Sequence, residues 1–348
     1  MYPCTMIRHG NTRPRTSEPR CISRRRLLGA ITLSLVRVPL PVEGQPSMHR
    51  IGVLAIGART SGFDGQSRPM IEQLRTDGWV EGANIAFEYR FDEGKRERLP
   101  ALAADLVKLK VSAIVAVGTP AALAAKGATA SIPIVMVHVG DPVRSGLVAS
   151  LRSPGGNVTG MAFLGSEITA KQVQLLKEVV PHARSLGLLF DPLNPNQVDA
   201  LTGPTFAAAA AAGLKLHPIK ADASAGLDAA FAEVIRTRVD VLLVWPLSRA
   251  AGWIQEAAAL ATKHRLVTLG TFRTYAEQGM LLSYIGRAEE QFQRAAVYID
   301  RLLKGAKPAD LPVEQPTRFD LTINLKTAKI LGLTIPPSLL LRADHVIE

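Results

Sequence analysis

Residues 112–143 read SAIVAVGTPAALAAKGATASIPIVMVHVGDPV, and their pattern indicates the fold class of the chain. The stretch opens with an apolar run over residues 112–117 and holds a second one over residues 132–139. Pro120 lies between them, two residues after Gly118, and proline is tolerated in the first turn of a helix. The spacing therefore predicts a strand, a helix and a strand, and uninterrupted apolar strands are typical of a parallel sheet covered on both faces.

The same alternation runs through most of the chain. Further strands are expected over residues 51–56, 84–91, 158–164, 186–190, 214–219, 241–244, 266–269 and 281–284. Helices are expected over residues 70–79, 99–110, 170–180, 207–212 and 289–304, and an extended stretch over residues 312–321. Two such series of similar length favour two α/β lobes with parallel sheets.

Composition limits the classes of function. The chain has 348 residues, of which 47% are apolar and 20% charged, enough apolar material for two cores. The formal net charge is +11, but residues 1–44 hold eight arginines and two acids, and the remaining residues mix 33 basic with 28 acidic side chains. A surface so mixed in sign, with only 5% aromatic residues, gives no reason to expect a nucleic-acid partner.

The N-terminal 44 residues predict an export signal and an N-terminal extension. Arg24, Arg25 and Arg26 precede an apolar run over residues 27–36, which is too short to span a bilayer. The arginine pair after Ser23 resembles a twin-arginine signal, and cleavage after Gly44 would release the mature protein into the periplasm. The alternative is a disordered basic tail on a cytosolic protein.

The sequence offers little for catalysis or metal binding. Cys4 and Cys21 both precede the apolar run, so the mature chain would contain no thiol. Motifs for a P-loop, a dinucleotide-binding turn, a nucleophile elbow and a zinc protease are all missing. The later histidines, among them His138, are scattered and are interpreted as surface or capping residues. We therefore predict no cofactor, no metal and no catalytic residues.

Polar residues stand where the strands of the first series are expected to end. Thr119 follows one strand and opens a helix whose free N–H groups suit a carboxylate. Asp141 and Pro142 follow the next strand, where the aspartate could face an ammonium group. The alternative is that Thr119 and Asp141 only cap their helices.

The second series ends its strands in the same way. Asn194 and Asn196 follow the strand at residues 186–190, Trp245 follows the one at residues 241–244, and Phe272 comes shortly after residues 266–269. Strand ends of this kind are where open α/β sheets bind ligands. A tryptophan there can stack on an apolar or aromatic ligand, although packing explains that residue equally well.

Several stretches spread over residues 50–348 resemble one family. They include residues 78–84, GWVEGAN, residues 140–143, GDPV, residues 153–160, SPGGNVTG, and residues 311–317, LPVEQPT. With them the sequence resembles bacterial ABC transporter substrate-binding proteins, and more narrowly the family that includes the binding component of tryptophan/tyrosine transport systems, which has a type I periplasmic-binding-protein fold.

The resemblance implies a domain division. It implies two Rossmann-like lobes with parallel sheets, residues 50–163 plus 286–312 and residues 165–284 plus 313–348, joined by a three-strand hinge near residues 163–166, 283–287 and 312–317. It also implies a small ligand held between lobes that close on it.

The resemblance also implies which residues bind. Thr119, Pro120 and Ala121 would hold the acidic end of the ligand, Asp141 and Pro142 would line the same wall, and Asn194 and Asn196 would approach from the other lobe. Trp245 and Phe272 would line the site at positions that vary within the family, so the resemblance does not identify the ligand. Gly57, at a strand end, and Tyr284, at a hinge crossing, complete the expected set.

The leading hypothesis is a monomeric, non-enzymatic periplasmic receptor. It would bind a small solute, such as an amino acid or a related carboxylate, and deliver it to an ABC permease and ATPase that are separate chains. The first alternative is an exported α/β enzyme acting on a small carboxylate, since fold does not determine function. The second is a stand-alone ligand sensor; a repressor-type sensor would need a helix-turn-helix module before residue 50, and the segment there cannot supply one.

Overall fold

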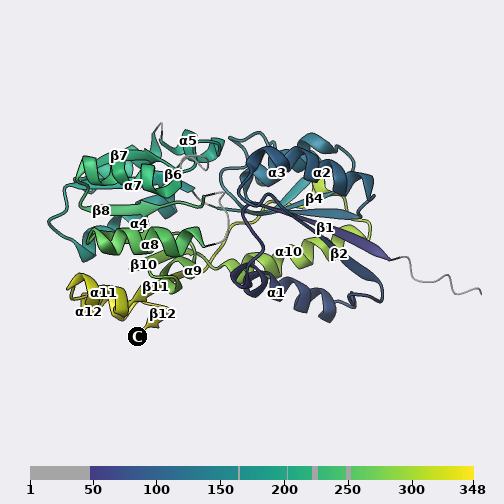
Figure 1. The fold of residues 1–348 in the computed structure, drawn as a ribbon. Coiled ribbons are helices and arrows are strands. Elements are labelled where there is room, and N and C mark those ends of the chain that lie inside the picture. Colours follow the sequence, from purple (N-terminus) through teal and green to yellow (C-terminus); the bar gives the residue numbers. More distant parts are fainter. Residues whose placement is uncertain (1–47, 164, 202, 222–225, 248–251) are drawn as a thin grey trace, which may run out of the picture. The chain divides into compact units, whose positions relative to one another are not determined.

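The computed structural model describes residues 48–163, 165–201, 203–221, 226–247 and 252–348. They belong to one compact unit, Gln45–Glu348, built on two β-sheets (Figure 1). The predicted export signal at residues 1–44 lies outside the described residues. Within the described ranges, no helix is both long enough and apolar enough to cross a membrane.

The first sheet is parallel throughout and has the strand order β2-β1-β3-β4-β5. Its strands are β1 (His49–Ala55), β2 (Ile85–Phe91), β3 (Ala113–Val117), β4 (Ile134–Val139) and β5 (Val158–Ala162). Every residue of β3 and β4 is buried, as expected for central strands covered on both faces.

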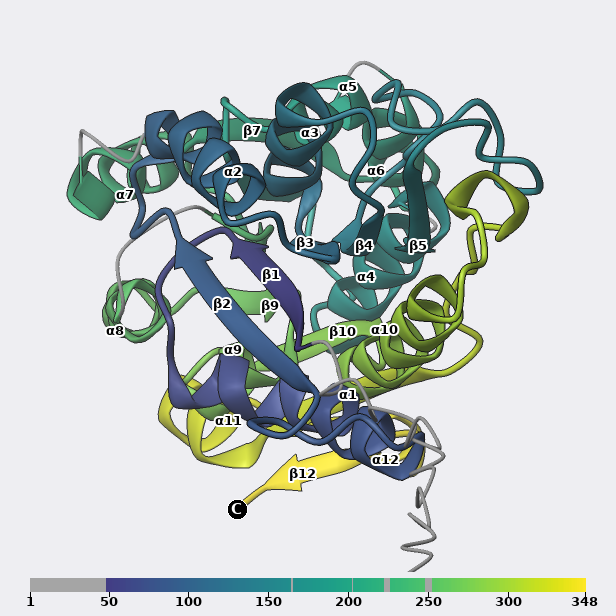
Figure 2. The same ribbon diagram turned by 90° about the vertical axis from the view of Figure 1, so that its right-hand side faces the viewer.

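Helices cover both faces of this sheet (Figure 2). They are α1 (Ser61–Thr76), the short 3₁₀ helix η1 (Arg96–Arg98), α2 (Leu99–Lys108), α3 (Thr119–Ala128) and α10 (Ala288–Leu303). Phe292 of α10 and Leu74 of α1 pack with Val53 on one face, and Leu106 of α2 packs with Ile114 on the other. A helix from late in the chain thus completes the core of the N-terminal sheet.

The second sheet has the order β12-β11-β10-β9-β8-β6-β7. Its strands are β6 (Ser185–Phe190), β7 (Lys215–Lys220), β8 (Val241–Val244), β9 (Val267–Gly270), β10 (Leu282–Gly286), β11 (Phe319–Asn324) and β12 (His345–Ile347). The associated helices are α4 (Gly165–Val179), α5 (Pro195–Leu201), α6 (Pro204–Ala211), α7 (Gly226–Thr237), α8 (Trp253–Lys263), α9 (Arg273–Glu277), α11 (Leu325–Leu331) and α12 (Pro337–Leu340). All pairs are parallel except β10 with β11.

Three segments of the chain connect the two sheets. The first follows β5, the second runs from β10 into α10, and the third leads from the 3₁₀ helix η2 (Pro308–Asp310) to β11. In the third, Glu314 exchanges backbone hydrogen bonds of 2.9 Å with Gly160 and Ala162, and its carboxylate accepts a 2.8 Å bond from Arg294 of α10. The third connection is thereby tied to the edge of the first sheet.

Gly160 in β5 shows how closely the backbones pack at this edge. Its φ is +124°, and a Cβ atom there would lie 2.4 Å from the carbonyl oxygen of Met136 in β4. Only glycine fits such an approach. The register between β4 and β5 shifts just beyond this point, between Met136 and Val139.

The α/β class with two Rossmann-like lobes is confirmed, with one refinement: β11 runs antiparallel to β10, so the second sheet is not purely parallel. The first helix begins at Ser61 rather than near residue 70, because the Thr60 side chain caps it by accepting a 3.2 Å bond from the Phe63 N–H. Between β6 and β7 the chain forms two short helices, α5 and α6. Most of the stretch at residues 312–321 is not strand, because β11 begins only at Phe319.

Candidate functional site

A cavity of about 630 Å³ lies at the carboxyl ends of the strands of both sheets. From the first sheet it is lined by the segments that follow β1, β3 and β4, and from the second by those that follow β6, β8 and β9, together with part of α4. Its volume is that of a typical small-molecule site, and strand carboxyl ends are where α/β sheets bind ligands. This cavity is the candidate functional site.

Thr119 connects the two sheets on one wall of the cavity. It is the first residue of α3 and is buried, and its hydroxyl oxygen accepts a 3.1 Å bond from the Gly140 N–H and a 3.0 Å bond from the Asn196 side-chain amide. Gly140 follows β4 and Asn196 lies on α5. A Cβ atom at Gly140 would lie 2.8 Å from the Asn196 amide nitrogen, so this approach of the two sheets depends on the glycine.

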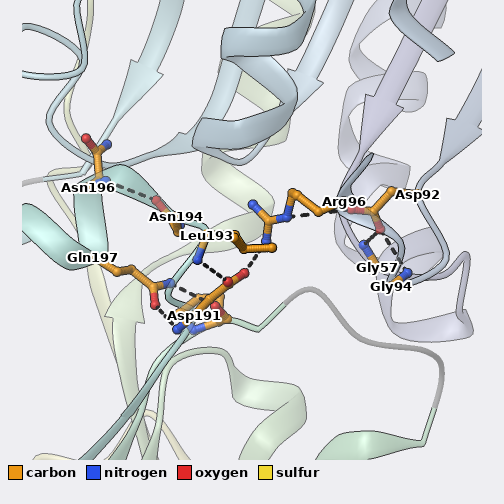
Figure 3. A network of polar contacts seen from close by, with 10 residues as sticks. Gly57, Asp92, Gly94, Arg96, Asp191, Leu193, Asn194, Asn196 and Gln197 are labelled. Carbon is orange, nitrogen blue, oxygen red and sulfur yellow. Dashed lines mark hydrogen bonds and ion pairs between the residues drawn. The ribbon is translucent and has the colours of Figure 1, made fainter. Parts of the chain in front are cut away.

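A buried ion pair makes a second connection between the two sheets (Figure 3). The guanidinium of Arg96, in η1, pairs with the carboxylate of Asp191, which follows β6. On its own side, Arg96 Nε lies 3.9 Å from a carboxylate oxygen of Asp92, which follows β2. The three side chains are at most 10% exposed. Burial lowers the pKa of the Arg96 guanidinium, and the charges of Asp191 and Asp92 offset part of that shift.

Backbone groups hold both carboxylates in place. Asp92 accepts hydrogen bonds of 2.7 and 3.0 Å from the N–H groups of Gly57 and Gly94, and Asp191 accepts one of 2.8 Å from Leu193. The Asp191 N–H donates to the side-chain oxygen of Gln197, also at 2.8 Å (Figure 3). Arg96 therefore meets two carboxylates that are each oriented by groups on their own side.

Aromatic rings meet around His138, at the end of β4. Its imidazole stacks on Phe163 with centroids 5.5 Å apart and planes at 8°, lies 5.0 Å from Phe272 of the second sheet, and packs edge-on against Phe292 at 5.3 Å. Burial lowers the pKa of His138 to about 3, so the ring is neutral near pH 7. Its φ of +54° is uncommon for a residue with a side chain.

Four side chains that line the cavity carry a buried polar atom with no hydrogen-bond partner among the described residues. These atoms are His138 Nε2, Gln172 Oε1, Asn196 Oδ1 and Thr205 Oγ1. Buried polar groups in proteins are nearly always paired. Such atoms around one cavity indicate contacts for a bound ligand.

The charged side chains of the cavity are separate from that set. Among the described lining residues they are Asp141 and Arg144, after β4, and Asp199 on α5. Arg144 and Asp199 approach to 4.0 Å and are each about half exposed. Both signs of charge thus stand at the more exposed side of the cavity.

The structure brings eight of the eleven predicted site residues to the cavity, and they are Gly57, Thr119, Asp141, Pro142, Asn194, Asn196, Trp245 and Phe272. Asp141 also caps its own turn, since one carboxylate oxygen accepts bonds of 3.1 and 3.0 Å from the N–H groups of Val143 and Arg144. Of the two roles predicted for Asp141, facing a ligand or capping, this oxygen has the capping role.

The other three predicted residues are not in the cavity lining. Pro120 and Ala121 are buried in the first turn of α3. The ring of Tyr284 stacks on Phe319, with centroids 5.7 Å apart. Tyr284 contacts the site only through its backbone oxygen, which accepts a 2.8 Å bond from the cavity-lining residue Gln172. In β10 strand alternation brings Ile285 to the cavity and turns Tyr284 away, and in the first turn of α3 Thr119 lines the cavity whereas Pro120 and Ala121 do not.

His138, Gln172 and Arg96 were not predicted as site residues. His138 was interpreted as a surface or capping histidine, and the structure corrects this, because the ring is buried at the cavity. Gln172 occupies an ordinary position in an amphipathic helix. Within the described ranges, no cluster of three or more His, Cys, Asp or Glu side chains could hold a metal ion.

Two α/β sheets joined by three segments, with a ligand-sized cavity between their strand ends, define the class of two-lobed solute-binding proteins. The chain belongs to the family of ABC transporter substrate-binding proteins, whose model matches residues 51–347.

Individual relatives agree with this assignment. The chain is 26% identical over 275 residues to a tyrosine-binding protein of Clostridioides difficile (strain R20291), covering 78% of this chain and 77% of the relative. A conserved domain protein of Vibrio cholerae has a crystal structure that matches with a TM-score of 0.79 and 30% identity, covering 86% of this chain and 99% of that one. An ABC domain from Streptococcus pneumonia in complex with L-Trp matches with a TM-score of 0.78 and 27% identity, covering 86% and 100%.

Proposed function

We propose that the chain is the periplasmic receptor of an ABC importer, which binds one small solute in the cavity and presents it to a separate permease and ATPase. Membership of the substrate-binding family and the cavity between the two sheets support this proposal. The N-terminal residues 1–44 would direct export, and the mature protein would act as a monomer. Binding, with no chemical step, is the activity we propose.

The first candidates for the solute are L-tryptophan and L-tyrosine. One relative is named as a tyrosine-binding protein and another was crystallised with L-Trp. The cavity suits such a molecule, since Phe163, Trp245 and Phe272 offer apolar surface while Asp141 and Arg144 offer both signs of charge. A zwitterion with an aromatic side chain would use both.

We further propose that the two lobes, each built around one sheet, close on the solute by bending at the three connecting segments. The contacts Thr119–Asn196 and Arg96–Asp191 would then form as the lobes close. Ligand binding would favour the closed form because the solute contacts both walls only there.

Titration calorimetry of the full chain tests the proposed function. L-Tryptophan or L-tyrosine is expected to bind with one molecule per chain, and the variant Asn196→Ala to bind it more weakly with little change in melting temperature, because residues in strand-end segments carry function more than packing. L-Lysine serves as a control with the wrong side chain. Folded protein that releases no binding heat with any aromatic amino acid would contradict the ligand class.

A further inference from the structure

Gln172 is a buried amide whose orientation is fixed. It lies on α4, is 1% exposed and lines the cavity. Its amide nitrogen donates a 2.8 Å bond to the backbone oxygen of Tyr284 in β10. A carbonyl oxygen can only accept, so the nitrogen must face Tyr284 and Oε1 must point the other way.

Gln172 Oε1 has no hydrogen-bond partner within the described part of the chain. The atom is an acceptor only, and leaving a buried acceptor unpaired is unfavourable. The three other unpaired atoms of the cavity do not specify their partner in this way, because a hydroxyl rotates, a histidine has two tautomers and the Asn196 amide faces a hydroxyl that can donate or accept. Gln172 therefore requires a donor from the ligand.

The surroundings of Gln172 indicate which kind of donor. The α4 and β10 neighbours that also line the cavity are Ile168 and Ile285, both buried and apolar, and Thr169, which is buried and uncharged. The charged lining residues, Asp141, Arg144 and Asp199, belong to other segments. An ammonium group buried beside Gln172 would lack a counter-charge among these neighbours, and an unpaired buried charge is far more costly than a neutral polar group.

We propose that Gln172 is a specificity-determining residue that accepts a hydrogen bond from an uncharged N–H or O–H group on the apolar part of the solute. This rests on the proposed function, because an indole N–H or a phenol O–H is such a group. The site would then select L-tryptophan and L-tyrosine over L-phenylalanine, which has a ring of similar shape but no donor and would leave Oε1 unpaired.

The test compares the affinities of the full chain for L-tyrosine, L-tryptophan and L-phenylalanine in three proteins. The parent is expected to bind L-tyrosine or L-tryptophan at least about tenfold more tightly than L-phenylalanine, in line with the cost of an unpaired buried acceptor. Gln172→Met, which keeps the length of the side chain but removes the acceptor, is expected to lose most of this preference while still binding L-phenylalanine. Gln174→Met, an exposed amide on the same helix, is the matched control and should keep the parent's preference.

The outcomes separate the two proposals. Equal binding of all three amino acids, or a preference that Gln172→Met leaves intact, overturns the role of Gln172 and leaves the proposed receptor function standing. No binding of any of the three to a folded parent overturns the proposed ligand class and the role of Gln172 with it. The melting temperature of each variant shows whether it is folded.

Discussion

His138 illustrates how burial fixes the state of a single side chain. Three aromatic rings, those of Phe163, Phe272 and Phe292, surround the imidazole. Phe292 packs in the core of the first sheet and Phe272 against the core of the second. Its folded pKa of about 3 lies below the usual value of 6.5. The ring can therefore serve as a neutral hydrogen-bonding group near pH 7.

This shift predicts a pH dependence of stability. Below about pH 6.5 the unfolded chain takes up a proton at His138 while the folded chain does not, so the free energy of unfolding should fall by up to about 1.4 kcal/mol per pH unit between pH 6 and pH 4. His138→Asn, which tolerates the positive φ, lacks this contribution. Urea unfolding of both proteins across this range measures it.

The two proteins are compared by the slope of the unfolding free energy against pH. Their absolute stabilities differ for another reason as well, because loss of the ring also removes packing. A shallower decrease of stability with falling pH in His138→Asn supports the account. Parallel curves for the two proteins would show that the imidazole takes up a proton in the folded state as readily as in the unfolded chain.

Among the elements, the segments after β2 and β6 carry the buried connection between the two sheets. Arg96 of η1 reaches Asp191, and backbone N–H groups orient the carboxylates of both Asp191 and Asp92. The pair exists only when the two sheets are close, whereas in a separated arrangement water would solvate all three charges. Such a pair affects the closed form more than the fold of either sheet.

We therefore expect Arg96→Met and Asp191→Asn to weaken solute binding by about tenfold or more. The first leaves the buried Asp191 carboxylate without its cation, and the second leaves Arg96 with the more distant Asp92, at 3.9 Å, as its counter-charge. The double variant should lose less than the sum of the two single effects. Calorimetric titration with the solute provides the affinities. Arg98→Met, an exposed arginine of the same short helix, is the control and should bind as the parent does.

The unchanged affinity of both single variants would show that this ion pair has no part in binding. An additive double variant would show that the two residues act independently of each other.

The elements that sequence predicts best here are the buried strands. β3 and β4 are found within two residues of their predicted limits, because a short continuous apolar run bounded by glycine or polar residues is typical of a buried strand. α5, α9 and β12 went unpredicted, since elements of three to seven residues carry too little periodicity. The start of α1 was not predicted, because residues 61–69 are mostly polar and lack the apolar spacing of a helix.

Candidate site residues were predictable where a strand end and a polar residue coincide, as at Thr119 and Asn196. Gln172 and Arg96 could not be found in this way. One is a single amide in a helix whose periodicity is otherwise ordinary, and the other stands in the charged stretch GKRER at residues 94–98, which is typical of an exposed loop. Their importance arises from partners more than 90 residues away in the sequence, Asp191 and Tyr284.

At the scale of the whole molecule, the account rests on two sheets that share one cavity. Each sheet has its own core, and the contacts Thr119–Asn196 and Arg96–Asp191 join the two. A solute that contacts both walls would add to these connections and favour the closed arrangement. Opening and closing would then require bending only at the three connecting segments.

Small-angle X-ray scattering of the full chain, recorded during titration with L-tryptophan, tests whether the two lobes close around the solute. The account predicts a radius of gyration that decreases on binding, with a concentration dependence that follows the calorimetric isotherm. Arg96→Met should need more L-tryptophan to reach the same decrease. Scattering that stays constant while calorimetry shows the site to be saturated would contradict closure of the two lobes around the solute.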